Sequence, residues 1–551
     1  MNTKKSSTLK YIISVLLFAV LFFVLSARPS FAASSEYTKI TVKKSSETVS
    51  TDAWEFQGTP YIAISTLKEY GDCSSFTIDE KAKRIYFKLS DMNIYIVDDE
   101  TTNFIKNNGG TCYIYVKVID NKNYVALNAI TQFAKLGYEF DGSTVYLAPY
   151  ANADNIAVIK NDTTAAESVI NGQGRNLELK KGQIVFVDSR GSFSSSIRTI
   201  AGDICYIANK AIAPVSDSSD LLDFQYTAKT KKNYTGKFNL TWHNMAGTTL
   251  DPPDETGGID VVAPTWCRQI VNGGGDVTNY CNKGYVDRCH DRGFNVWLCI
   301  TNNMATSGAT NYTAKVLADS GLRNKTIAQY LFYAALYDMD GINVDYESLK
   351  NSDRENFTAF AQTLGKYTKK LGLTYSICLP PVATWYVEYD YEALGACSDY
   401  ICMMTYDQNV SNAGSGASFD WVESSVQTML NYVPSGKIML GIPFYARVWT
   451  ISGSKATSKT QNLDSLKATV ASWGVTPTWN PTNRQYIASH GSQKIWLEDT
   501  RSIANKMTLV YTYDLAGTCC WSHGLANDTI YQLFEDVYKY HVDPDTITPA
   551  F

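Results

Sequence analysis

Between residues 237 and 541, short and continuously apolar runs alternate with segments that are long enough to form helices. A strand that is buried on both faces reads as an unbroken apolar run, and strands separated by helices assemble into parallel sheets. Eight such runs are present, which is the number of strands that closes a (β/α)8 barrel. They are residues 238–242, 261–266, 294–300, 342–346, 374–379, 400–405, 438–442 and 518–521. We therefore predict the α/β fold class, with a barrel over residues 236–545.

This segment is longer than a minimal TIM (β/α)8 barrel, which takes about 250 residues. The excess lies between the seventh and eighth apolar runs, at residues 451–508. We expect it to form an α+β lobe inserted between strands 7 and 8. The whole chain has 551 residues, which is more than one hydrophobic core usually holds, so further domains should precede the barrel.

The fourth apolar run has a polar residue at every second position. Asn343, Asp345 and Glu347 alternate there with bulky apolar side chains. Side chains two residues apart on a strand share a face, so the three polar groups form one row. In a parallel barrel this row points into the interior and rises toward the C-terminal mouth, where active sites form.

Two neighbouring buried carboxyl groups cannot both stay charged at little cost, so the pKa of at least one of them should rise. Glu347 is the last of the row and the nearest to a substrate at the mouth. We interpret it as a proton donor. Asp345 and Asn343, lower on the strand, would support it through hydrogen bonds.

The acidic residues between positions 338 and 347 allow two other interpretations. A calcium-binding loop uses such ligands, but it places glycine at its sixth position, whereas Gly341 falls at the fourth. A solvated acidic strand edge is the second alternative. The regular apolar alternation argues against it.

The stretch from Asp340 to Glu347 reads Asp-Gly-Ile-Asn-Val-Asp-Tyr-Glu. It resembles the strand-four signature of glycoside hydrolase family 18, Asp-Gly-x-Asp-x-Asp-x-Glu, and the resemblance extends over residues 237–541. Further matches follow in order: Met403-Met404-Thr405-Tyr406-Asp407, Gly441-Ile442-Pro443-Phe444-Tyr445-Ala446-Arg447, and Ala516-Gly517-Thr518-Cys519-Cys520-Trp521. Chitinases usually carry Asp where this chain has Asn343. The amide is similar to the branch that contains spore-cortex and cell-wall N-acetylglucosaminidases.

The resemblance implies a retaining, substrate-assisted glycosidase that cleaves β-1,4 bonds next to N-acetylglucosamine in peptidoglycan or chitin-like polymers. Glu347 would protonate the leaving oxygen, Asp345 would orient the acetamido group of the sugar, and Tyr406 would hold that group. It implies no cofactor and no metal. The residues implied to bind the N-acetylated polysaccharide are Asn343, Met404, Asp407, Arg447 and Trp521.

The sequence before the barrel suggests two small domains and a connection. Residues 36–150 contain two similar units of strand, short helix and hairpin, and resemble the α+β domain named after the N-terminus of copper amine oxidases. Residues 156–214 contain short β runs joined by glycine turns, and resemble bacterial SH3-like domains. Residues 215–235 are polar and read as a linker. Cell-wall attachment and simple spacing are both open as roles for these modules.

The N-terminus has the pattern of a secretory signal peptide over residues 1–32. Three lysines precede an apolar run at residues 11–25, and small residues follow near Ala32. The run is shorter than the about 20 residues that span a bilayer. We therefore expect cleavage, no stable membrane span afterwards, and a secreted protein that is extracellular or held at the cell wall. An uncleaved anchor is the alternative.

Charge and cysteine content narrow the function further. The net charge is −5 with both signs interspersed, which excludes the clustered basic surface of a nucleic-acid-binding protein. Of the 12 cysteines, several lie inside apolar runs, so we expect packed thiols rather than a disulfide framework. None of the 5 histidines has a partner at metal-ligand spacing.

Two functions other than glycoside hydrolysis are open. The barrel could be a non-catalytic, lectin-like carbohydrate-binding protein, or the chain could be a structural surface protein whose N-terminal modules carry the function. Lectin-like members of such barrels typically lose the terminal acid. Glu347 is present here, which favours the enzyme.

Overall fold

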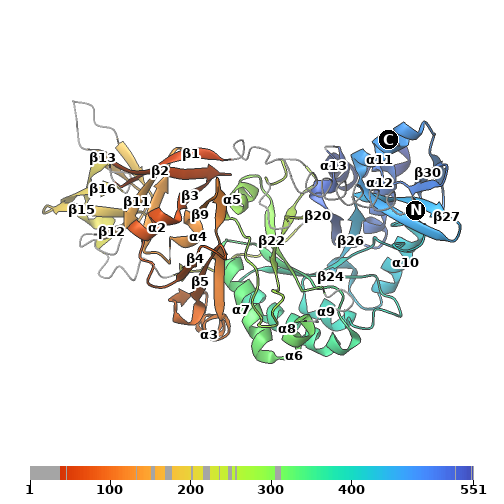
Figure 1. Cartoon of the computed structure of the whole chain (residues 1–551), viewed down its shortest axis with the longest axis horizontal. Coiled ribbons are helices and arrows are strands. Elements are labelled where there is room, and N and C mark those ends of the chain that lie inside the picture. Colours follow the sequence, from red (N-terminus) through yellow and green to blue (C-terminus); the bar gives the residue numbers. More distant parts are fainter. Residues whose placement is uncertain are drawn as a thin grey trace, which may run out of the picture.

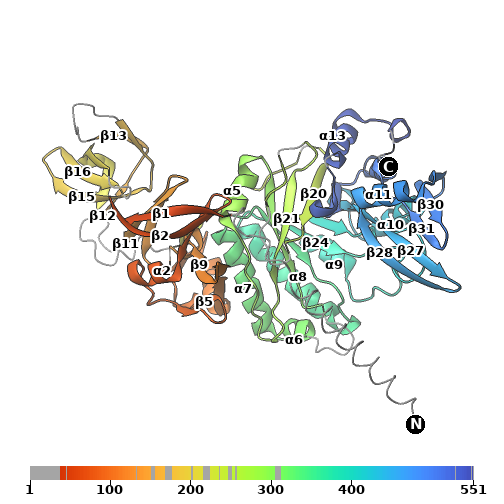
Figure 2. The same cartoon turned by 45° about the horizontal axis from the view of Figure 1, so that its top comes forward.

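The computed structural model describes residues 37–44, 46–131, 133–149, 156–167, 176–199, 203–214, 224–234, 236–245, 251–254, 257–304, 312–527, 529–547 and 549. The predicted signal peptide lies outside these residues, as does the first part of the predicted linker, 215–223. Two β-rich units, the barrel and a lobe follow one another along the long axis of the molecule (Figure 1, and from another side in Figure 2). No helix in the described ranges is long and apolar enough to cross a membrane.

The first unit, residues 37–149, combines two sheets with short helices. The larger sheet has the order β10-β11-β1-β2-β3-β9-β8 and the smaller one β4-β5-β7. The two similar units predicted from the sequence correspond to β3-α2-β4-β5 and β9-α4-β10-β11. The bounds are β1 (Thr38–Lys44), β2 (Glu47–Phe56), β3 (Thr59–Ala63), α2 (Ile64–Tyr70), β4 (Thr77–Asp79), β5 (Arg84–Lys88), β6 (Ile94–Tyr95), α3 (Asp99–Asn108), β7 (Thr111–Tyr115), β8 (Lys117–Ile119), β9 (Lys122–Ala126), α4 (Leu127–Ile130), β10 (Leu136–Phe140) and β11 (Thr144–Pro149).

The second unit, residues 156–214, is one antiparallel sheet of order β14-β13-β17-β16-β15-β12-β18. A small apolar core that includes Ile159, Val185 and Ile197 holds it together. Its resemblance to an SH3-like domain stays a prediction. The strands are β12 (Ile156–Ile159), β13 (Thr163–Glu167), β14 (Asn176–Leu179), β15 (Ile184–Arg190), β16 (Ser194–Thr199), β17 (Ile204–Ala208) and β18 (Ile212–Pro214).

The barrel closes in the order β20-β21-β22-β23-β24-β25-β26-β32, and every neighbouring pair is parallel. All eight predicted strands are confirmed, with ends that differ by a few residues at most. Their residues are almost all buried, which explains the unbroken apolar runs. The strands are β20 (Phe238–His243), β21 (Val261–Arg268), β22 (Asn295–Thr301), β23 (Gly341–Asp345), β24 (Thr374–Leu379), β25 (Tyr400–Met403), β26 (Ile438–Pro443) and β32 (Gly517–Trp521).

Helices cover the outside of the barrel, as Figure 1 shows for α7 and α8. In α8, one apolar face that includes Phe357, Phe360 and Leu364 is buried, as expected for a helix packed on a sheet. The helices are α5 (Lys283–Asp291), α6 (Tyr312–Ala318), α7 (Ser320–Leu336), α8 (Arg354–Lys370), α9 (Tyr391–Cys397), α10 (Phe419–Met429), α12 (Thr500–Thr512) and α13 (Ile530–Tyr540).

The inserted lobe lies between β26 and β32, as predicted, but it begins at Tyr445 rather than at residue 451. A single residue, Phe444, separates β26 from the first lobe strand, so the sequence shows no break at which the lobe begins. The lobe sheet has the order β28-β27-β31-β30-β29. Its elements are β27 (Tyr445–Ser452), β28 (Lys455–Asn462), α11 (Leu463–Trp473), β29 (Thr478–Asn480), β30 (Gln485–His490) and β31 (Gln493–Trp496).

The first unit packs directly on the barrel helices. Phe332 and Tyr333 of α7 are fully buried, and Phe87 and the backbone of Tyr113 contact them. Asn282, at the start of α5, donates a hydrogen bond to the Tyr61 hydroxyl. A cavity of about 170 Å³ lies between the two bodies, lined by tyrosine and asparagine side chains from both. The first unit is therefore packed directly on the barrel.

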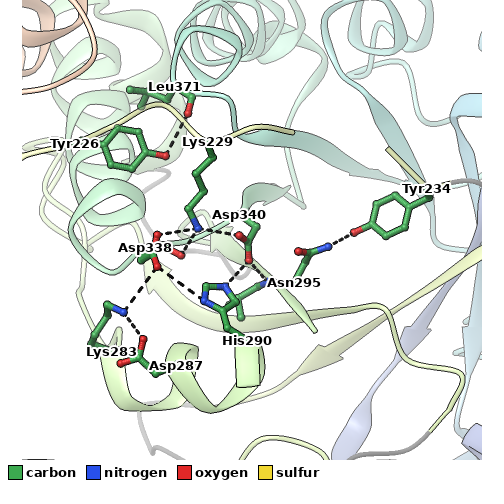
Figure 3. Close-up of polar contacts among 11 residues, drawn as sticks. Tyr226, Lys229, Tyr234, Lys283, Asp287, His290, Asn295, Asp338, Asp340 and Leu371 are labelled. Carbon is green, nitrogen blue, oxygen red and sulfur yellow. Dashed lines mark hydrogen bonds and ion pairs between the residues drawn. The ribbon is translucent and has the colours of Figure 1, made fainter. Parts of the chain in front are cut away.

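The described half of the predicted linker, residues 224–234, is also packed. Phe224 and Gln225 form β19, which pairs with β6 of the first unit. Lys229 then reaches the amino ends of the barrel strands, where its Nζ lies 2.8 Å from both Asp338 and Asp340 (Figure 3). The Asp340 carboxylate also contacts His290 Nε2 at 2.7 Å. This ion cluster joins the connection to the end of the barrel opposite the mouth.

Candidate active site

Strand β23 places the polar row inside the barrel. Asn343 is fully buried and Asp345 is 6% exposed, while Glu347 follows the last strand residue and is partly buried. Bulky neighbours Ile342 and Val344 face the helices and belong to the large outer core. The inward orientation predicted from the alternation is therefore confirmed.

A cavity of about 240 Å³ lies at the mouth of the barrel. Four barrel strands supply its walls at or just beyond their carboxyl ends, and the lobe adds one residue. Because side chains from the ends of different strands meet there, this is where a barrel of this kind builds its site. The cavity is lined by Trp242, Asp345, Glu347, Met404, Tyr406, Asp407, Tyr445 and Trp521.

The backbone of Glu347 is fixed from the side by Asn302, which follows β22. The Asn302 side chain accepts from Glu347 N at 2.9 Å and donates to Glu347 O at 2.8 Å. Asn302 is itself buried and donates to the Thr313 hydroxyl. Because the Asn302 amide binds both the N–H and the C=O of Glu347, it fixes the backbone orientation and thus the direction in which the Glu347 side chain points.

Both carboxyl groups have raised pKa values. Burial, together with the neighbouring Glu347, raises the pKa of Asp345 to about 8. Burial and the nearby Asp407 raise the pKa of Glu347. Among the described residues, Asp345 Oδ1 has no hydrogen-bond partner. The pair therefore retains a proton near neutral pH, as an acid catalyst requires.

Asn343 forms the base of the row and does not line the cavity. Its Oδ1 accepts from Trp242 Nε1 at 2.9 Å, and its Nδ2 donates to Ser376 Oγ at 2.9 Å. Cys378 and Cys402 also contact its amide. Asn343 thus holds Trp242 and Ser376 from below the cavity, and its contact with substrate stays a prediction.

All twelve cysteines are free thiols, and most are buried. Cys299, Cys378, Cys402 and Cys519 pack with Met439 inside the barrel. The predicted use of thiols as small packing groups is thus confirmed for these positions. No cluster of three or more potential metal ligands occurs among the residues that the structure describes.

The far wall comes from β25 and the lobe. Arg447 of β27 forms an ion pair with Asp407, with 2.7 Å between Nη2 and Oδ1. The ring centres of Tyr406 and Tyr445 lie 6.4 Å apart, with the rings edge to face. Met404 lines the cavity, whereas Arg447 contacts Asp407 from outside it. That either residue binds substrate stays a prediction.

Two indoles form the apolar floor. Trp521 ends β32 and its ring centre lies 5.9 Å from that of Trp242, near the end of β20. Sequence reasoning assigned Trp521 but missed Trp242 and Tyr445 as site residues. A Trp near the carboxyl end of the first predicted strand was the available signal for Trp242. Tyr445 reaches the site only because the lobe starts earlier than predicted.

Comparison with known proteins agrees with this geometry. Residues 268–526 match the family described as glycosyl hydrolases family 18. The barrel is a family 18 domain. This match accounts for the motif on β23 and for the barrel fold.

Relatives of the family 18 domain include bacterial glycosylases. The domain is similar to the uncharacterized glycosylase YvbX of Bacillus subtilis, at 23% identity over 40% of this chain and 67% of the relative. It is also similar to the cortical fragment-lytic enzyme of Bacillus anthracis, at 27% identity over 41% of this chain and 56% of the relative. The match thus spans between about half and two thirds of these proteins.

Among solved structures, the spore cortex-lytic enzyme SleL of Bacillus megaterium superposes with a TM-score of 0.50 and 18% identity. The match covers 61% of this chain and 77% of that chain. At this identity the likeness concerns the fold alone. It supports the barrel fold.

Proposed function

We propose that the chain is a secreted glycosidase that cleaves β-1,4 bonds next to N-acetylglucosamine in peptidoglycan, with Glu347 as the acid. The observation that carries this proposal is the shared cavity: Glu347 and Asp345 both have raised pKa values there, above a floor formed by Trp242 and Trp521. A sugar ring stacks its apolar face on such indoles.

Retaining, substrate-assisted catalysis fits the placement of the carboxyl groups. In the two-carboxylate scheme, acid and nucleophile flank the scissile bond from opposite faces. Here Asp345 and Glu347 rise from one strand, and the other carboxylate of the cavity, that of Asp407, is held by Arg447. Neither neighbour of Glu347 is therefore a free nucleophile across the cavity.

The reaction would proceed in two steps. Glu347 gives its proton to the glycosidic oxygen as the bond to the anomeric carbon breaks, and the carbonyl oxygen of the sugar's own acetamido group bonds to that carbon. Asp345 stabilises the resulting oxazolinium cation, and the Tyr406 hydroxyl holds the acetamido group. Water, deprotonated by the Glu347 carboxylate, then attacks the anomeric carbon. The bond from this carbon to the acetamido oxygen breaks, which opens the oxazolinium ring and restores the acetamido group. Two displacements retain the configuration.

We favour peptidoglycan over chitin as the proposed substrate because of the activities for which relatives of this domain are named. These relatives include cortical fragment-lytic enzymes of Bacillus, and Asn343 is similar to the branch that contains spore-cortex enzymes. Secretion through the N-terminal signal and wall attachment through the N-terminal units complete this proposal.

The test is fragment release by the full chain from purified spore cortex, vegetative peptidoglycan and chitin, followed by mass spectrometry. Glu347→Gln should abolish release while binding is retained, because the amide has no acidic proton. Glu355→Gln, which makes the same change on the exposed face of α8, is the matched control and should release fragments as the wild type does. Equal release by wild type and Glu347→Gln would refute the assignment. Binding without release by either would favour a lectin.

A further inference from the structure

Residues 407–418, which carry Asp407 from the end of β25 toward α10, are held by the inserted lobe. Arg447 of β27 pairs with Asp407, and Trp449 Nε1 of the same strand donates to Gly414 O at 2.9 Å. Phe419 N, at the end of this loop, donates to Asn483 O. We call residues 407–418 the Asp407 loop.

Behind the loop lies an ion pair that solvent does not reach. The side chains of Lys506 and Glu498 are 0% and 1% exposed, with 2.9 Å between Lys506 Nζ and Glu498 Oε2. The Ser502 hydroxyl donates to Glu498 Oε2, and Gln485 Nε2 donates to Glu498 Oε1 at 2.5 Å. Both carboxylate oxygens are therefore occupied, as a buried charge requires.

A single amide connects this pair to the loop. Gln485 of β30 is fully buried, and its Oε1 accepts from Ser415 Oγ at 2.5 Å. The Ser415 hydroxyl oxygen in turn accepts from Ala417 N at 3.1 Å, and Asn409 Nδ2 donates to Ser415 O at 2.9 Å. The chain of contacts thus runs from the lobe into both halves of the Asp407 loop.

The charge of Glu498 sets the direction of the hydrogen bonds that run through Gln485 to Ser415. An amide side chain can present either its oxygen or its nitrogen to a neighbour. A carboxylate only accepts, so Glu498 forces the Gln485 nitrogen toward itself and the Gln485 oxygen toward Ser415. Burial raises the pKa of Glu498, and the Lys506 ammonium 2.9 Å away opposes this by favouring the charged form. An apolar pair in the same place would leave the amide free to turn.

We propose that Glu498, Lys506, Gln485 and Ser415 form a brace that fixes the Asp407 loop at the mouth of the barrel. They touch no substrate and are positioning residues for the reaction. The capping box at the start of α12 supports this role. Asp499 and Ser502 exchange side-chain and backbone hydrogen bonds there, which sets where the helix starts and thus where Lys506, one turn later, points.

This inference rests on the proposed function, because the position of Asp407 affects the reaction through the pKa of Glu347, the proposed acid. The titratable or charged groups around Glu347 come from five elements: Asp345, Cys299, Tyr389, Tyr406, Asp407 and Tyr445, with Arg447 behind Asp407. Asp407 is the neighbour whose charge raises the pKa of Glu347. If the loop moves outward, that pKa falls.

The experiment breaks the brace without removing the ion pair. Ser415→Ala removes the hydrogen bonds of its hydroxyl with Gln485 and Ala417. Gln485→Met removes those with Ser415 and Glu498. The control Ser425→Ala removes a buried serine hydroxyl on α10 that donates to Trp421 O of the same helix. Two readouts need no turnover: hydrogen exchange of amides 408–417 and titration of the Glu347 carboxyl by NMR. Where the wild type hydrolyses peptidoglycan, kcat and its pH profile are measured as well.

We expect amides 408–417 of both variants to exchange about tenfold faster, and the pKa of Glu347 to fall by about half a unit. In an active enzyme, kcat should fall about tenfold because a slightly misplaced group is costly. The double variant should lose no more than the larger single change. Exchange and titration equal to those of the wild type and Ser425→Ala would overturn the brace. A wild type without hydrolysis would refute the proposed function instead, while exchange and titration still decide the brace.

Discussion

The indole Nε1 of Trp242 donates a 2.9 Å hydrogen bond to Oδ1 of Asn343, across the interior of the barrel from β20 to β23. The floor of the cavity and the base of the catalytic strand are thereby one unit. The Asn343 amide, with two donors and one acceptor, also holds Ser376 on β24. A carboxylate at this position would accept only.

This contact predicts the effect of Trp242→Phe. The variant keeps an aromatic floor but leaves the buried Asn343 oxygen without its indole donor. We expect the free energy of unfolding to fall by about 1–3 kcal/mol, as measured by urea denaturation. Trp421→Phe, at a half-buried indole of α10, is the control. A smaller loss for Trp242→Phe than for the control would contradict the structural role.

Removing the charge of Asp407 should shift the pH profile in a defined direction. Glu347 acts while protonated, so activity falls as pH rises through its pKa. Since Asp407 raises the pKa of Glu347, Asp407→Asn should move the basic limb of kcat/KM to lower pH. Arg447→Met leaves the Asp407 charge unpaired and should move the limb to higher pH. Asp420→Asn, on the exposed side of α10, should leave it in place. Shifts in the same direction for the first two variants would rule out this electrostatic account.

The docked first unit predicts where the barrel is sensitive to mutation. Phe332 of α7 is buried against Phe87 and Phe133 of that unit, so Phe332→Ala should cost about 3–5 kcal/mol of unfolding free energy. Glu100 forms ion pairs with Lys366 and Lys370 at the exposed rim of the same interface. Glu100→Gln should leave Tm nearly unchanged, because exposed ion pairs contribute little. Scanning calorimetry of both variants tests this. A large effect of the rim variant and a small one of Phe332→Ala would show that the interface does not form as described.

The ion cluster at the closed end of the barrel predicts a pH-dependent contribution to stability. His290 and Lys229 hold the pKa of Asp340 below its ordinary value of 3.8, despite burial. The Asp340 carboxylate therefore stabilises the fold above pH 3.8, and this contribution is lost as pH falls through its lowered pKa. At pH 7 the free energy of unfolding of Asp340→Asn should be lower than that of the wild type. This difference should shrink as the pH falls below 3.8. A difference that stays constant between pH 7 and pH 3 would be inconsistent with this ion cluster.

Much of the barrel could be predicted because its strands are buried on both faces and so appear as apolar runs. Glu347 and Asp345 could be placed because position along a strand decides which side chains face the mouth. Tyr406 and Met404 were placed only through the family resemblance. Tyr445 and Trp242 could not, because their place in the cavity depends on the closure of the barrel and on where the lobe begins. The ion pairs of Lys229 could not be predicted either. Its partners Asp338 and Asp340 lie more than 100 residues later in the sequence, and only the folded barrel brings them to the connection.

The most direct test of the central claim is proton NMR of freshly released sugar ends during hydrolysis of a purified peptidoglycan fragment by the full chain. The account predicts that the β-anomer appears first, that the α-anomer follows only by mutarotation, and that neither appears with Glu347→Gln. An α-anomer formed first, or unchanged release by Glu347→Gln, would contradict it.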